Sequence, residues 1–170
     1  MHSSKIITRG NPPTEPPEGH TWRSMMDIAM RAGFKARQND EVPIGAALFT
    51  AQGELLATGN NSPVIDNDPT AHAEVICIRN ACESLNNYRL PQGTVLAVTL
   101  EPCIMCLGAI IHARVGGVIF GAPDLRAGAI VSNLEGTDLP FVNHRFWTIG
   151  GVCEEECKTM LQSFFLQRRK

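Results

Sequence analysis

The sequence HAE at residues 72–74, together with PCIMC at residues 102–106, decides the fold and the chemistry that we expect of this chain. An imidazole and two thiolates are typical zinc ligands, and three protein ligands leave the fourth tetrahedral position of the ion open. Water at an open zinc position loses a proton near neutral pH and becomes a nucleophile. Glu74 is two residues from the histidine, so it can move protons beside the ion without binding it. The expected ligands of one Zn²⁺ per chain are His72, Cys103 and Cys106.

Each half of this pattern is ambiguous by itself, because Cys-x-x-Cys is either a redox pair or half of a zinc site. A zinc site that only stabilises the fold needs a fourth protein ligand, and Cys77 and Cys82 are candidates by residue type. However, Cys77 is five positions after His72 and therefore lies roughly 140° away from it around a helix, which is a poor position for binding the same ion. A redox pair would leave His72 and Glu74 without a role. The combined pattern H-x-E…P-C-x-x-C is typical of zinc-dependent nucleobase deaminases.

Length and composition predict one soluble domain with a hydrophobic core, since the chain has 170 residues of which 44% are hydrophobic. The net charge of −2 is not the strongly basic balance of general nucleic-acid binders, so no DNA duplex is expected as a partner. No apolar run is long enough to cross a membrane, and the N-terminus lacks the apolar core of a secretory signal. Six cysteines without such a signal favour a reducing cytoplasm over a disulfide framework.

The order of sequence patterns predicts an α/β layered domain. Residues 1–19 contain repeated prolines and are expected to form an extended or poorly ordered tail, followed by a single zinc deaminase domain over residues 20–170. The expected helices cover residues 22–38, residues 69 onward, residues 102 onward and residues 153–169. The expected strands cover residues 44–50, 54–59, 94–100 and 115–121, with a polar loop over 60–68.

Both metal-binding segments then fall at helix N-termini. The second of these four helices is expected to start at Pro69 or Thr70, capped by Asp68 or Thr70, with His72 in its first turn. The positive end of a helix dipole favours thiolates and lowers the pKa of cysteine. Free backbone N–H groups at such ends can also bind substrate atoms, and the candidates are those of Ala73 and Cys103.

Longer strings outside the metal pattern resemble the bacterial tRNA adenosine deaminases. They are EVPIGA (41–46), Asn61 with Pro63, DPTAHAE (68–74), NYRL (87–90), TLEPCIMC (99–106), IHARV (111–115), FGAPD (120–124) and NHR (143–145). The resemblance spans about residues 24–169. It implies a cytidine deaminase-like three-layer α/β/α sandwich with a central five-stranded mixed sheet, and a homodimer.

The resemblance also implies an activity and roles for individual residues. The activity is hydrolytic conversion of the wobble adenosine of a tRNA anticodon to inosine, with the anticodon stem-loop as the partner. Glu74 matches the proton shuttle, and Asn61 matches the side chain that contacts the flipped purine. Asp124 and Phe165 match positions that line the neighbouring nucleotides.

The sequence departs from the family pattern at positions that are often basic. Pro123 and Gly117 stand at two of them, and phosphate contacts usually contribute much of the affinity for RNA. A deaminase of a free base or nucleoside, of guanine or cytosine type, is therefore an alternative that uses the same zinc chemistry. A second alternative is a non-catalytic binding module stabilised by zinc, although such a module has no use for Glu74.

Overall fold

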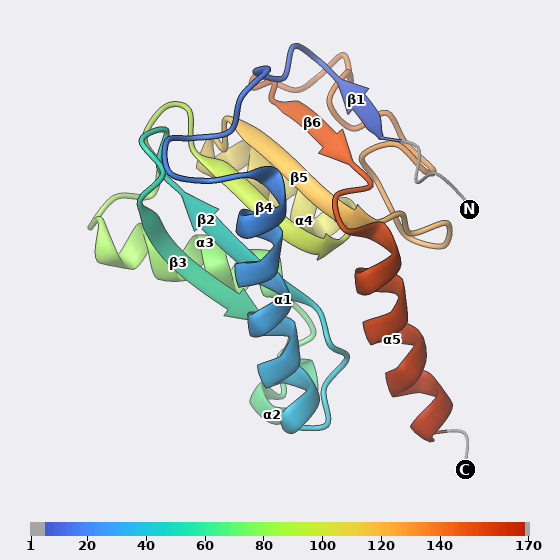
Figure 1. Ribbon diagram of the computed structural model, residues 1–170. Coiled ribbons are helices and arrows are strands. Elements are labelled where there is room, and N and C mark those ends of the chain that lie inside the picture. Colours follow the sequence, from blue (N-terminus) through green and yellow to red (C-terminus); the bar gives the residue numbers. More distant parts are fainter. Residues whose placement is uncertain (1–5, 169–170) are drawn as a thin grey trace.

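The computed structural model describes residues 6–168, which are built around one six-stranded mixed sheet (Figure 1). Its strands are β1 (Ile7–Arg9), β2 (Gly45–Phe49), β3 (Leu55–Asn60), β4 (Val95–Leu100), β5 (Gly117–Ala122) and β6 (Trp147–Gly150). Their order in the sheet is β1-β6-β5-β4-β2-β3. β4, β5 and β6 run parallel, whereas β2 is antiparallel to both of its neighbours. The central strands β4 and β5 are almost entirely buried, which explains their nearly continuous apolar sequence.

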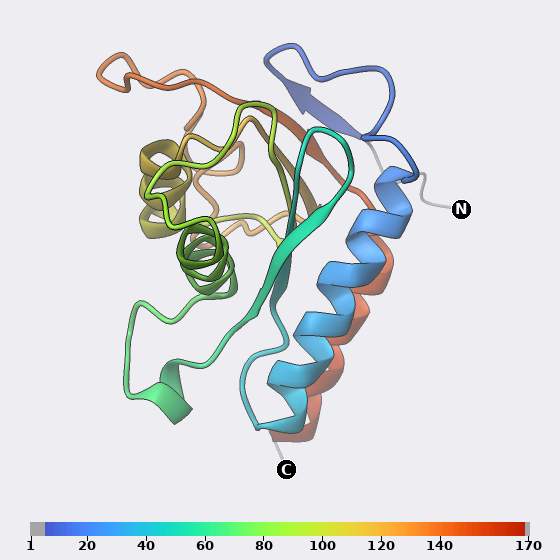
Figure 2. The ribbon, with the colours of Figure 1, turned by 90° about the vertical axis from the view of Figure 1, so that its left-hand side faces the viewer.

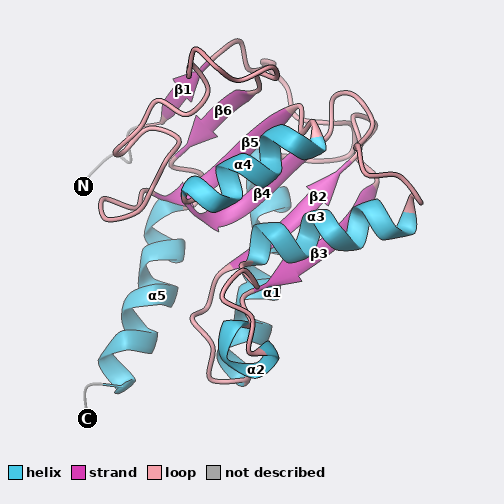
Figure 3. Ribbon diagram, turned by 180° about the vertical axis from the view of Figure 1, so that it is seen from behind, coloured by secondary structure: helices cyan, strands magenta, loops and turns pink. Residues whose placement is uncertain are grey.

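Helices cover both faces of the sheet, so the predicted three-layer α/β/α arrangement is confirmed. They are α1 (Trp22–Gln38), α2 (Pro63–Asp66), α3 (Ala73–Ser84), α4 (Ile104–Ala113) and α5 (Glu154–Arg168). Figure 2 shows α1 in front of α5 on one face of the sheet, and Figure 3 shows α3 and α4 on the opposite face. α1 begins directly after its predicted cap, Thr21. No helix among residues 6–168 is long and apolar enough to cross a bilayer.

Alternate side chains of β4 divide the core into two clusters, one on each face. Leu96 and Val98 pack under α3 and α4, whereas Val95 and Ala97 belong to the cluster that includes Met25 of α1. This alternation follows from the two-residue period of a strand. Because both clusters use β4, the two helical layers share one rigid central strand.

The expectation of five strands is wrong, because the sheet has a sixth strand, β1. It lies inside the segment for which an extended or poorly ordered tail was expected, and it pairs antiparallel with β6 from Ile7↔Gly150 to Arg9↔Thr148. A three-residue strand is too short to produce a recognisable alternation of apolar and polar residues. The short helix α2 was missed in the expected polar loop over 60–68 for the same reason of length.

Gly59 in β3 sets how closely α3 approaches the sheet. A Cβ atom at this position would lie 2.2 Å from the Ala73 carbonyl oxygen and 2.5 Å from the Cys77 nitrogen. We expect Gly59→Ala to lower the free energy of unfolding by about 3 kcal/mol, the upper end of the range for overpacking. Urea denaturation measures this change. Gly108→Ala on α4 is the control, since its added methyl meets no atom within 4 Å; equal losses in both variants would contradict the assignment.

Candidate active site

The three predicted metal ligands converge between the N-termini of α3 and α4. The ligand atoms of His72, Cys103 and Cys106 all lie within 4.8 Å of one another. The Nδ1 atom of His72 is 3.6 Å from the Cys103 Sγ and 3.5 Å from the Cys106 Sγ. Ligands at zinc bonding distance from one tetrahedral ion are separated by about 3.6 Å. Both the donor set and its spacing therefore fit a zinc ion bound by three protein ligands.

Two of these ligands are N-cap residues rather than helical residues. His72 has φ −77° and ψ 151°, Cys103 has φ −77° and ψ 175°, and neither side chain caps its own helix. The prediction that the first metal helix starts at Pro69 or Thr70 is wrong. Asp68 accepts hydrogen bonds from the Thr70 N–H, at 2.8 Å, and from its hydroxyl, which closes a turn before α3 begins. The extended caps leave both ligand side chains free to face the ion.

The two cysteines are hydrogen-bonded to each other. The contact with Cys106, followed by that with His72, lowers the pKa of Cys103 to about 3 despite partial burial. The hydrogen bond to Cys103 and burial raise the pKa of Cys106. Because a thiol must lose its proton to bind a metal ion, Cys103 is the more readily ionised of the two cysteine ligands.

Glu74 lies in the first turn of α3 and is 4% exposed. Burial raises its pKa to about 7, and the charges of Cys103 and His72 act on the same carboxyl group. A carboxyl group with a pKa near neutrality can both accept and release a proton at working pH. Its position beside the cluster and its pKa both suit the predicted shuttle.

Two of the predicted substrate contacts are hydrogen-bonded to one another. Asn61, directly after β3, is 5% exposed, and its Oδ1 accepts a hydrogen bond of 2.9 Å from the Ala73 N–H. The Ala73 N–H is therefore used within the protein. This bond fixes the orientation of the amide, so that Asn61 offers its Nδ2 hydrogens to a ligand.

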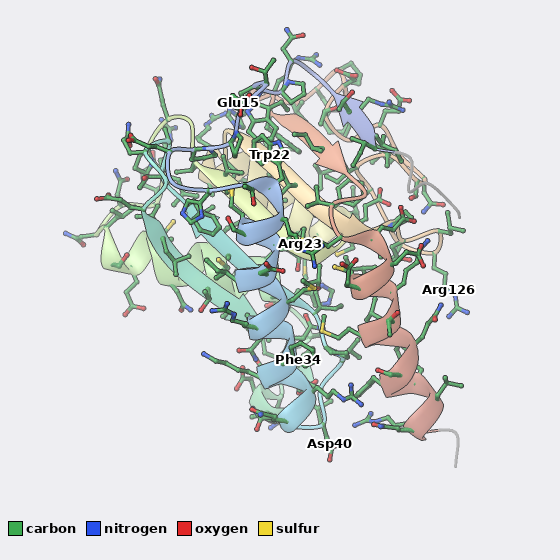
Figure 4. The ribbon with its side chains drawn as sticks, viewed as in Figure 1. Glu15, Trp22, Arg23, Phe34, Asp40 and Arg126 are labelled. Carbon is green, nitrogen blue, oxygen red and sulfur yellow. The ribbon has the colours of Figure 1, made fainter. Side chains whose placement is uncertain are left out.

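Two further predicted contacts, Asp124 and Phe165, line one groove between α5 and the segment after β5. The groove has a volume of about 790 Å³ and also includes Val42, Leu100 and Arg126. Figure 4 shows Arg126 projecting beside α5. The Asp124 Oδ1 accepts the Arg126 N–H at 2.9 Å and thereby closes a turn in its own segment, whereas the Phe165 ring is 47% exposed.

Sequence reasoning missed two buried carboxylates that organise the segments around the site. Glu41 accepts hydrogen bonds from Val64 N–H at 2.7 Å and Ile65 N–H at 2.9 Å, which holds the start of α2 just after Asn61. Glu101 accepts five hydrogen bonds from residues 124–132. The available signal was a glutamate followed within two residues by a proline, as in Glu41 with Pro43 and Glu101 with Pro102.

A family model for the cytidine and deoxycytidylate deaminase zinc-binding region matches residues 20–122. The chain belongs to this deaminase family. Curated relatives of this deaminase include the tRNA-specific adenosine deaminase of Haemophilus influenzae, 42% identical over 86% of this chain and 84% of that protein. The tRNA-specific adenosine deaminase of Bacillus subtilis is 41% identical over 85% of this chain and 89% of its own length. The chain is thus a zinc-dependent hydrolytic enzyme, which excludes the non-catalytic binding module.

Solved structures agree with the family assignment. A structure from a study of A-to-I editing by tRNA:A34 deaminases has a TM-score of 0.78 and 40% identity, and the match covers 81% of this deaminase and 99% of that chain. The guanine deaminase of Nitrosomonas europaea has a TM-score of 0.71 at 22% identity, over 91% of this deaminase and 93% of that chain. At this lower identity the likeness shows the fold alone.

Proposed function

We propose that this deaminase converts the wobble adenosine of a tRNA anticodon loop to inosine, with water consumed and ammonia released. The observation that carries the proposal is the level of identity to the tRNA-specific adenosine deaminases, about 40% over most of both chains. The guanine deaminase shares the fold at 22% identity. A free base or nucleoside is therefore the less favoured substrate.

The chemistry follows from the cluster and from Glu74. His72, Cys103 and Cys106 would hold zinc, which when bound lowers the pKa of a water molecule and so supplies a nucleophile near neutral pH. Glu74 takes a proton from the attacking water and delivers it to the purine ring nitrogen. It then takes the proton of the newly added hydroxyl group and delivers it to the amino group, which leaves as ammonia while the C6 carbonyl forms. Its pKa of about 7 suits both transfers, and its burial keeps bulk water from competing for the proton.

Purine recognition is assigned to the Asn61 amide. Because Oδ1 accepts from the Ala73 N–H, Nδ2 donates to an acceptor nitrogen of the purine. Asn61→Asp keeps the acceptor but replaces this donor with oxygen. We expect kcat/KM to fall roughly 10- to 100-fold, as for one lost buried hydrogen bond, in steady-state assays. Zinc content should stay at one ion per chain. Unchanged kinetics on every substrate would remove Asn61 from recognition.

The groove that contains Phe165 and Asp124 is assigned to the nucleotides next to the target. An exposed aromatic ring gives an unstacked base a surface on which to stack. A nucleotide in a loop leaves its stack at lower cost than a paired one, so an anticodon loop suits a buried catalytic carboxyl group. We therefore assign the stacking of a neighbouring base to Phe165.

We also propose a homodimer that forms through the face of α3 and α4. Tyr88 is 72% exposed beside these helices, and Ile104, directly after the Cys103 ligand, is 61% exposed. A partner on this face would cover both side chains and border the site. Light scattering after gel filtration tests the mass.

A tRNA substrate and six free cysteines fit a cytoplasmic location.

The deciding experiment is mass-spectrometric detection of deamination by the zinc-loaded protein. The substrates are an anticodon stem-loop with a wobble adenosine, and separately adenine, adenosine, guanine, cytosine and cytidine. We expect inosine at the wobble position only, with a rate that falls steeply as salt is raised because phosphate contacts are screened. Product from a free base or nucleoside alone would refute the tRNA substrate.

A further inference from the structure

Glu101 is 2% exposed and is surrounded by donors from a single loop, residues 124–132. Its Oε1 accepts from the backbone N–H groups of residues 130–132 at 3.1, 2.8 and 2.9 Å. Its Oε2 accepts from the Asp124 N–H at 3.0 Å and from the Ser132 hydroxyl. The conformation of the whole loop is therefore tied to one carboxylate.

The loop, and not a cation, stabilises this buried charge. Within residues 6–168, no lysine, arginine or histidine forms an ion pair with Glu101. Burial raises the pKa of Glu101, but the hydrogen bonds from Ser132, Val131 and Asp124 outweigh burial and lower the pKa overall. A group that only accepts hydrogen bonds thus meets four N–H groups and one hydroxyl, all placed to donate.

The same loop is joined to the segment that carries the metal ligands. The Ala129 N–H donates to the Pro102 carbonyl at 2.8 Å, and Gly128 forms an isolated antiparallel bridge with Cys103. A Cβ atom on Gly128 would lie 2.4 Å from the Glu101 carboxyl group, so the loop backbone rests directly on it. At its other end the loop carries Asp124, which lines the groove.

We propose that Glu101 is a positioning residue for RNA recognition, which holds residues 124–132 as the wall between the Cys103 ligand and the groove for neighbouring nucleotides. This inference rests on the proposed function of the site. Glu101 acts through the loop and touches neither the reacting atoms nor the RNA. Its loss should therefore weaken binding of the stem-loop more than it slows the chemical step.

Glu101→Gln tests this role with the smallest change of shape. With the amide oxygen in place of Oε1, the three bonds from residues 130–132 remain, whereas the amide nitrogen opposes the Asp124 N–H. We expect KM for the anticodon stem-loop to rise roughly 10- to 100-fold, as for one lost hydrogen bond to a charged group. We expect kcat to change less than about threefold. Zinc should remain at one ion per chain.

Glu135→Gln is the matched control, because it removes the same charge from an exposed side chain nearby. It corrects for the general gain in RNA affinity when a negative charge is lost. A loss of kcat with unchanged KM, or a loss of zinc, in Glu101→Gln alone would overturn the proposal. Equal values of KM and kcat for Glu101→Gln and Glu135→Gln would also overturn the proposal.

Abasic substitutions of the stem-loop provide a readout that a merely structural role would not move. Removing, one at a time, each base next to the target should raise KM of the wild type at one or more positions. At those positions, removal of the base should raise KM by a smaller factor in Glu101→Gln than in the wild type, because the groove that contacts the base is no longer formed. Equal penalties in both proteins would contradict the role.

Gly128→Ala is the second variant, for use if Glu101→Gln does not fold. The added methyl pushes the loop away from the carboxylate from the opposite side, so the same rise in KM and the same reduced penalties are expected. Wild-type kinetics of Gly128→Ala would overturn the proposal. Failure of the wild type to deaminate the stem-loop would instead refute the proposed function, so the two failures are distinguishable.

Discussion

Glu74→Gln is expected to abolish turnover while leaving the metal site intact. Glutamine fills the same volume in the first turn of α3 but cannot carry a proton from the attacking water to the purine. General acid–base catalysis contributes about 10²- to 10⁴-fold, and we expect kcat for the stem-loop to fall by the upper part of that range. Zinc content by elemental analysis should not change. A variant that retains wild-type kcat would remove Glu74 from proton transfer.

The same variant should reveal the cost of burying this carboxylate in protein stripped of metal. Burial raises the pKa of Glu74 to about 7, above its value of about 4.3 in an unfolded chain. The folded state then binds more protons between these two values, so wild-type stability falls as pH rises through this window. We expect the stability advantage of Glu74→Gln to increase from pH 4 to pH 8 in urea titrations. An advantage that is independent of pH would contradict the raised pKa.

Cys106→Ala is expected to lose zinc and stability together. Cys106 is completely buried, and its thiolate is one of three ligands, so its removal leaves only His72 and Cys103 for the ion. A ligand present at about 1,000 times its dissociation constant stabilises the folded state by about 4 kcal/mol. We therefore expect a loss of this size, measured as a lower Tm and a lower urea midpoint. Cys82→Ala, at a cysteine outside the cluster, is the control and should keep its zinc.

Adding a chelator distinguishes the stability contributed by the bound metal from the stability contributed by packing of the Cys106 side chain. A chelator should lower the Tm of the wild type and of Cys82→Ala towards that of Cys106→Ala, whose own Tm should hardly change. Full zinc occupancy in Cys106→Ala would refute the ligand assignment. An equal change of Tm on adding the chelator to all three proteins would also refute the ligand assignment.

Elements with long and regular sequence patterns were predictable. The apolar spacing of residues 22–38 and the capping residue Thr21 specify α1, and the unbroken apolar run of β4 specifies a buried strand. The metal ligands were predictable as well, because His72, Cys103 and Cys106 are ligand types in a family-specific order. In these cases local sequence and tertiary structure favour the same conformation.

The remaining features depend on contacts between segments that are distant in the sequence. Pro69 and Thr70 have the residue types of a helix start, but Asp68 closes a turn there and the helix begins only at Ala73. The Asn61–Ala73 hydrogen bond exists because Gly59 allows α3 to lie against β3. Similarly, Glu101 meets its donors only after β4 and β5 have paired. No local sequence pattern encodes these contacts between distant segments, so the role of residues 124–132 as the wall of the groove could be identified only from the structure.

The short strand β1 also protects the molecule against aggregation. Without it, β6 would expose a row of unpaired N–H and C=O groups, which is a template for strands of other molecules. β1 covers that row but is only three residues long, and its charged Arg9 lies at the new boundary. A short, charged boundary is a poor template for edge-to-edge association. The strand β1 of the N-terminal segment thus covers the edge of the sheet opposite β3.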